Sequence, residues 1–210
     1  MLLSKLNKYT TTVLFGVGRL VSYNNCMPKF YTKSGDDGYS GRLGEGRIPK
    51  NHPVMEAVGA IDEASAVLGI ARAQSQTNST NDLLLNVQRD LYHLMAEVSA
   101  TPENAAKFRL IDEGKIRWLE EMTDTIGSSI TMPNEFIVPG DSLGGASFAL
   151  SRAVVRRAER RVADLHLAGV IENENLLRYL NRLSSLCFVL ELRENQLSDS
   201  LTQTLAKTED

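Results

Sequence analysis

The chain has 210 residues, of which 42% are hydrophobic and 23% charged, and its formal net charge is −3 at pH 7. This composition is that of a globular protein with a sizeable core. The slight excess of acid argues against general nucleic-acid binding, which usually needs a basic domain, but it leaves room for a local basic pocket. Two cysteines and three histidines are scattered along the chain, so neither a disulfide framework nor a metal cluster held by protein ligands is expected.

The first segment, residues 1–26, differs in composition from the rest. It carries Lys5, Lys8 and Arg19 but no acidic residue, and it is rich in serine and threonine. Such a leader is typical of a mitochondrial transit peptide, and a disordered N-terminal arm is the alternative. Its apolar part is too short to span a membrane. We therefore expect a mitochondrial protein, or otherwise a cytoplasmic one, that binds neither membrane nor nucleic acid.

Residues 29–50 contain five glycines and are predicted to form a loop rather than a helix or a regular strand. Glycine allows backbone N–H groups to turn toward an anion, as in phosphate-binding nests. Thr32, Lys33 and Ser34 add hydroxyl donors and a positive charge. The segment lacks the pattern of a Walker loop. A phosphate-binding loop and a flexible surface loop both fit.

A helix is predicted from Pro53 to about Gln74, because Asn51 offers a capping side chain shortly before the proline. Apolar side chains recur at helical spacing along one face. Asp62 directly follows that face in the middle of the helix. A carboxylate there either needs a cationic partner or faces solvent.

Four more helices are predicted from apolar residues at helical spacing. They cover about residues 81–99, 112–126, 142–168 and 172–197. A connector at 128–140 carries the apolar residues Phe136 to Pro139, and residues 199–210 are expected to be a polar tail. With short connections and no strand alternation, residues 27–198 are predicted to form one all-α domain, a five-helix antiparallel bundle.

The segment Arg152–Arg161 carries five arginines and one glutamate on the fourth long helix. At about 100° per residue, Arg152, Arg156 and Glu159 lie within roughly 60° of one another beside an apolar face. Because the guanidinium fork matches phosphate oxygens, this cluster suggests a bound polyanion. The alternative is a solvated, salt-bridged helix face, and the other three arginines are assigned to such a face.

Four separated segments together resemble the PduO-type ATP:cob(I)alamin adenosyltransferases. They are Tyr31-Thr-Lys-Ser-Gly-Asp-Asp-Gly38, Glu56-Ala-Val-Gly-Ala-Ile-Asp-Glu63, Phe136-Ile-Val-Pro-Gly140 followed by Arg152-Ala-Val-Val-Arg-Arg-Ala-Glu-Arg160, and Tyr179-Leu-Asn-Arg-Leu-Ser184. The resemblance covers about residues 29–195 in the same order. It implies a five-helix bundle that forms a homotrimer with active sites between subunits.

The resemblance implies an enzyme that transfers the 5′-deoxyadenosyl group of ATP to the cobalt of cob(I)alamin and releases triphosphate. Mg2+ is expected to be held through the phosphates, with no metal ligand from the protein. A reductase or a cobalamin-dependent mutase is a possible partner. One alternative is an ATP-binding regulator or chaperone that handles cobalamin without turnover, and another is a purely structural helical oligomer.

On the nucleotide side, the resemblance implies roles for several residues. Arg156 is expected to contact the phosphates, and Glu159 and Asn181 to fix the nucleotide and its ribose. Lys50 would add positive charge near the start of the first helix. The polyphosphate would be held by a loop that includes Thr32, Lys33, Ser34, Gly35 and Gly38.

On the corrinoid side, the resemblance implies that Phe136 closes the corrin pocket and keeps a lower ligand off the cobalt. Asp62 is expected to pair with Arg152 across the subunit interface. Together with Arg156 these residues form the expected catalytic set.

Three positions depart from the family pattern. Asp37 stands where lysine is common, Ala149 where histidine is common, and Ser185 where aspartate is usual. Asp37 weakens the positive charge of the expected phosphate loop, whereas the other two changes concern contacts on the corrinoid side.

Overall fold

The computed structural model describes residues 30–198 and 203–207, so the predicted leader lies outside the described residues. The chain divides into two compact units, residues 1–37 and residues 38–210, and all the helices and strands described belong to the second.

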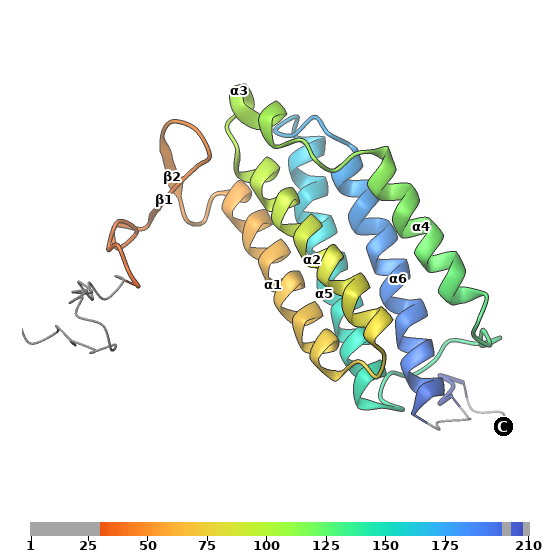
Figure 1. The fold of residues 1–210 in the computed structure, drawn as a ribbon. Helices are drawn as coiled ribbons and strands as arrows, with labels where there is room; N and C mark the ends of the chain where they lie inside the picture. Colours follow the sequence, from red (N-terminus) through yellow and green to blue (C-terminus); the bar gives the residue numbers. More distant parts are fainter. Residues whose placement is uncertain (1–29, 199–202, 208–210) are drawn as a thin grey trace, which may run out of the picture. The chain divides into compact units, whose positions relative to one another are not determined.

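Long helices dominate the second unit (Figure 1), and the all-α prediction is confirmed. The long helices are α1 (Pro53–Gln74), α2 (Asn78–Ser99), α4 (Glu113–Gly127), α5 (Leu143–Leu167) and α6 (Asn175–Leu197). Between α2 and α4, the one-turn helix α3 (Pro102–Ala105) continues into a 3-10 turn, Ala106–Phe108. These two turns were not predicted from the sequence, although Pro102 suits a first helical turn.

Side-chain caps set the helix starts. Ser142 accepts a hydrogen bond from the Gly145 N–H at 2.9 Å, which starts α5 where the sequence predicted. Thr77 caps α2, so this helix begins three residues earlier than expected. The cap of α1 is His52, whose Nδ1 accepts from the Val54 N–H at 3.2 Å, rather than the expected Asn51.

A small hairpin precedes α1, which corrects the prediction that residues 29–50 hold no regular strand. Strand β1 (Tyr39–Gly41) pairs antiparallel with β2 (Arg47–Pro49). Two of the five glycines, Gly44 and Gly46, lie in the turn with positive φ, which leaves the flanking residues free to pair. The Leu43 N–H also bonds the Ser99 carbonyl at 3.2 Å, which ties the turn to the end of α2.

Helix α5 packs against both α1 and α6, α2 packs against α1, and α4 packs against α6 (Figure 1). The predicted inward face of α5, which runs from Phe148 through Val155 to Leu165, is buried. Cys187 of α6 is also completely buried, and burial raises the pKa of its thiol to about 12. The thiol therefore stays protonated and packs as a small apolar group. None of the helices in the described ranges is long and apolar enough to cross a membrane.

Residues 203–207 do not form the frayed tail that the sequence predicted for 199–210. They pair with the connector between α4 and α5 through an antiparallel bridge of Leu205 to Ile137. The Ala206 N–H donates to the Phe136 carbonyl at 2.7 Å, and the Val138 N–H donates to the carbonyl of Thr204 at 2.8 Å. The end of the chain therefore holds the backbone on both sides of Ile137.

Candidate functional site

A polar cavity of about 430 Å³ lies between α5 and α6. It is lined by Arg156, Glu159, Arg160 and Ala163 of α5 and by Leu177, Arg178, Asn181 and Arg182 of α6. Four of these side chains are arginines, so the cavity is suited to a polyanion. Three of the residues predicted to bind nucleotide, Arg156, Glu159 and Asn181, meet here.

Hydrogen bonds fix the polar wall of this cavity. The Asn181 amide donates from Nδ2 to Glu159 Oε1 at 2.9 Å, and its Oδ1 accepts from Arg182 at 2.9 Å. Arg182 in turn donates from Nε to Glu120 Oε1 at 2.7 Å. The orientation of Asn181 therefore depends on a carboxylate of α4, because Arg182 connects the two.

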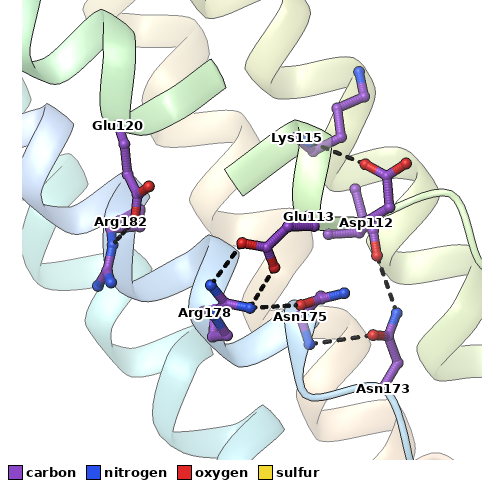
Figure 2. Close-up of polar contacts among 9 residues, drawn as sticks. Asp112, Glu113, Lys115, Glu120, Asn173, Asn175, Arg178 and Arg182 are labelled. Carbon is purple, nitrogen blue, oxygen red and sulfur yellow. Dashed lines mark hydrogen bonds and ion pairs between the residues drawn. The ribbon is translucent and has the colours of Figure 1, made fainter. Parts of the chain in front are cut away.

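Helix α4 holds α6 through a second arginine as well (Figure 2). Arg178 donates two hydrogen bonds to the Glu113 carboxylate, at 2.5 and 3.0 Å, and a third to Asn175 Oδ1. The guanidinium of Arg178 lowers the pKa of Glu113, which favours the charged carboxylate. Asn173, just before α6, donates to the Ile111 carbonyl at 3.2 Å.

Arg178 and Arg182 were not predicted from the sequence to line the cavity. They lie one turn apart on α6, opposite two glutamates of α4 that are two turns apart. The opposite charges on the two helices are the signal that could have revealed them. Arg160, which was assigned to a solvated face, also lines the cavity.

The remaining arginines of α5 agree with the solvated-face interpretation. Arg157 pairs with Glu63 of α1 at 2.6 Å, and Arg161 lies 3.9 Å from Asp164 of the same helix. Both pairs are exposed, so their contribution to stability is small.

A second cavity of about 650 Å³ lies beside the connector between α4 and α5. Its walls are the connector residues 132–137 and 139, Arg152 and Arg156 of α5, Ser184, Ser185, Phe188, Val189 and Glu191 of α6, and Lys207. Phe136 lies in this wall with 85% of its surface exposed, which is unusual for a large apolar side chain. Arg156 lines both cavities, so they are neighbours.

Arg152 and Glu191 lie in the wall of the larger cavity with unsatisfied polar atoms. Arg152 Nε and both carboxylate oxygens of Glu191 are buried without a hydrogen-bond partner among the described residues. Burial raises the pKa of Glu191, an effect that the charge of Arg152 partly offsets. Asp62 is exposed on α1, and within one chain no ion pair joins it to Arg152 among the residues that the structure describes.

The expected phosphate loop falls in both units. In the first, Thr32 and Ser34 hydrogen-bond through their hydroxyls at 2.7 Å, and Lys33 has a φ of 62°. The Asp36 N–H bonds the Lys33 carbonyl at 3.3 Å, so these residues form a turn that spans Gly35. In the second unit the Lys50 N–H bonds the Gly38 carbonyl at 2.9 Å. Gly38 and Lys50 line neither of the two cavities.

The acidic side chains do not gather into a metal site. Over residues 30–198 and 203–207, no group of three or more His, Cys, Asp or Glu side chains is placed to hold a metal ion. In the arginine-lined cavity, Glu159 is the acidic side chain.

Comparison with known proteins links this arrangement to one family. A family model described as cobalamin adenosyltransferase matches residues 30–194. The corrinoid adenosyltransferase of Bacillus subtilis is 35% identical over 164 residues, which are 76% of this chain and 83% of that protein. The human corrinoid adenosyltransferase MMAB is 34% identical over 171 residues, or 78% and 68% of the two chains.

The corrinoid adenosyltransferase PduO of Citrobacter freundii is 32% identical over 166 residues, which are 79% of this chain. This chain spans about half the length of that relative, 49%. Among solved structures, a phenylalanine-to-alanine variant of the PduO-type ATP:corrinoid adenosyltransferase of Lactobacillus reuteri, complexed with cobalamin and ATP, is similar with a TM-score of 0.79. It is 26% identical, and the match covers 86% of this chain and 100% of that one.

Proposed function

The chain belongs to the cobalamin adenosyltransferase family, and we propose that it transfers the 5′-deoxyadenosyl group of ATP to the cobalt of cob(I)alamin, releasing triphosphate. The observation that carries this proposal is the position of Arg156 in the walls of two neighbouring cavities. One cavity is rich in arginine and suits a triphosphate, and the other is larger and rimmed by Phe136. Transfer between two bound molecules requires such adjacency, because the reacting atoms must come within a few ångströms.

The nucleotide is assigned to the smaller cavity. Arg156, Arg160 and Arg178 supply guanidinium groups for the phosphates, and Glu159 with Asn181 supplies an acceptor and an amide for the ribose hydroxyls. The similar Lactobacillus reuteri variant is complexed with ATP as well as with cobalamin, which supports a nucleotide site in this fold.

The corrinoid is assigned to the larger cavity, where Phe136 faces the lower side of the ring. In the Lactobacillus reuteri variants, the replaced phenylalanine and the replaced arginine are separated by as many residues as Phe136 and Arg156 are here. This equal spacing supports the assignment of both residues to the reaction. An apolar group below the cobalt also excludes water as an axial ligand.

In the proposed step, the electron pair of Co(I) attacks the 5′ carbon of ATP. The new Co–C bond forms as the C–O bond breaks, and the bonding pair leaves with the triphosphate. Cobalt itself is the nucleophile, so the protein has to position the 5′ carbon and stabilise the charge that grows on the leaving group. Arg156 is placed to stabilise the leaving group because its side chain lines both the arginine-rich cavity and the larger one.

Mg2+ is proposed to arrive bound to the phosphates of ATP, where it would neutralise part of their charge. Glu159 is the carboxylate in the lining of the arginine-rich cavity, so most ligands of the metal would be phosphate oxygens and water. The arginines and the metal would therefore share the charge of the triphosphate.

The assembly is proposed to be a homotrimer of five-helix subunits, with Asp62 of one subunit paired with Arg152 of its neighbour. The exposure of Asp62 supports this pairing. The neighbour would then also bring its glycine-rich turn, with Thr32, Lys33 and Ser34, to the phosphates. Residues 1–26 are proposed to direct the protein to mitochondria, where a reductase would supply Co(I) and a mutase would use the product.

The direct test is to incubate the full chain with Mg-ATP and chemically reduced cobalamin and to follow adenosylcobalamin by its absorbance. Product formation at many turnovers per subunit is the expected result. With cob(I)alamin confirmed to be present, absence of product would exclude the enzyme. If ATP still bound in that case, measured by calorimetry, the ATP-binding regulator would be the better interpretation.

A further inference from the structure

Glu191 is a buried carboxylate for which the fold offers no partner. Its side chain is only 1% exposed, and neither oxygen accepts a hydrogen bond from residues 30–198 or 203–207. Leaving a buried charged group unpaired is unfavourable, so such groups are rare and often mark strained, catalytic or ligand-binding positions. Glu191 belongs to the wall of the larger cavity, so it lies beside any molecule held there.

The next helical turn shows that α6 does satisfy a buried carboxylate where the fold alone needs it. Glu194 is fully buried, but it accepts from the Ser75 hydroxyl at 3.0 Å and from the Gln76 N–H at 3.3 Å. Glu194 thus ties α6 to the end of α1. The two glutamates lie three residues apart on one helix, and the one at the cavity is the one without a partner.

Arg152 supplies the complementary group. Its Nε is buried and donates to no acceptor, and the residue lines the same cavity as Glu191. The two side chains make no ion pair with each other, although the charge of Arg152 acts on Glu191. The wall of the larger cavity therefore contains an unsatisfied hydrogen-bond donor, Arg152 Nε, and an unsatisfied acceptor, the Glu191 carboxylate.

A primary carboxamide matches this pair, since it offers N–H donors and a carbonyl acceptor on one planar group. Building on the proposed function, we propose that Glu191 and Arg152 recognise a peripheral carboxamide of the corrinoid. The Glu191 carboxylate accepts from the amide nitrogen, and Arg152 Nε donates to the amide oxygen. Cobalamin carries several such amides on its ring, whereas its acid precursors carry carboxylates at the same positions.

The charges that line the larger cavity make Glu191 the residue that distinguishes a corrinoid with amides from one with carboxylates. Arg152, Arg156 and Lys207 would attract a corrinoid with carboxylate side chains. The charge of Lys207 is partly matched by Glu135, 3.8 Å away. Glu191 repels a carboxylate at the site and accepts from a neutral amide, so it selects the amidated substrate.

The test compares binding of cobinamide, whose peripheral groups are amides, with binding of cobyrinic acid, whose peripheral groups are carboxylates. Equilibrium dialysis in the presence of Mg-ATP gives both dissociation constants. We expect the native protein to prefer cobinamide by about tenfold or more. Glu191→Gln keeps the side-chain shape and adds an N–H donor, so it should tighten binding of the acid and lower the preference by about tenfold.

Two further variants separate recognition from folding. Glu191→Leu removes the acceptor, so it should weaken cobinamide binding about tenfold while Tm does not fall and ATP binding is unchanged. Glu194→Gln is the matched control, because it should lower Tm and leave the cobinamide preference unchanged.

Two results overturn the inference. If the native protein forms adenosylcobalamin but Glu191→Gln keeps the native preference, Glu191 does not select the amide, and the proposed function stands. If the native protein binds neither corrinoid and forms no product, the proposed function and this inference both fail.

Discussion

Arg156 is the residue for which the geometry makes the sharpest prediction, because its exposed side chain borders both cavities. Arg156→Ala should lower the rate of adenosylcobalamin formation by about 100-fold or more, since a donor to the leaving group is lost. The far-ultraviolet circular dichroism and Tm should be unchanged because the side chain is exposed. Arg161→Ala, which removes only a distant surface pair, serves as control. A variant with near-native turnover would refute the role in phosphate binding.

Glu191 gives a prediction about stability in the absence of ligand. Burial raises its pKa in the folded state, so the folded state retains this proton to a higher pH than the unfolded state does. The residue therefore lowers stability increasingly as the pH rises above the ordinary pKa of a glutamate. Glu191→Gln should raise the free energy of unfolding by about 1 kcal/mol at neutral pH, and the gain should shrink toward that ordinary pKa. Urea denaturation at several pH values measures the difference, and a gain that does not depend on pH would contradict the explanation.

At the scale of elements, helix α4 contributes to the nucleotide cavity without lining it. Glu120 holds Arg182, which holds Asn181, which donates to Glu159. Glu120→Ala should therefore raise the KM for ATP about three- to tenfold, while Tm changes little because the ion pair is half-exposed. Steady-state kinetics with ATP varied provides the measurement, with Glu121→Ala as the neighbouring control. An unchanged KM would mean that Asn181 is held by other contacts.

The segment 203–207 is the element with the clearest expected effect on the corrinoid side. Its backbone bonds fix the connector on both sides of Ile137 and thus the backbone of Phe136. Deleting residues 199–210 should raise the KM for cob(I)alamin by about tenfold and leave ATP binding unchanged, because none of the described residues 203–207 lines the nucleotide cavity. Kinetics with each substrate varied separates the two effects. Equal changes for both substrates would indicate a general loss of structure instead.

At the scale of the whole molecule, the proposed trimer makes a prediction that does not need a structure of the assembly. If Asp62 of one subunit pairs with Arg152 of the next, Asp62→Ala and Arg152→Ala should each lose most activity. Co-expressing the two variants should restore about a quarter of the native activity, because a mixed ring has one interface with both side chains intact. Mixing the separately folded variants without subunit exchange is the control. Activity that stays absent on co-expression would refute a pair between subunits.

Local chemistry explains why the sequence alone predicted so much of the fold. The apolar residues of α5 and α6 recur at helical spacing, and the Ser142 cap bonds a residue close to it in sequence. Because both signals are local, the helix positions could be predicted directly. The hairpin β1–β2 was not predicted, because each strand by itself has the sequence of a loop and only their pairing makes them strands. The end of the chain was missed for the same reason, since residues 203–207 gain order only from a connector far away in sequence.

The candidate site likewise combines residues that the sequence predicted with features that only the structure showed. Arg156, Glu159 and Asn181 were predicted from sequence because their chemistry is carried by short motifs on single helices. That Arg156 borders two cavities, that Arg178 and Arg182 are held by α4, and that Glu191 lacks a partner became visible only in the structure. Periodicity determines which face of a helix is buried, whereas the packing of one helix against another determines which polar side chains meet and which are left unpaired.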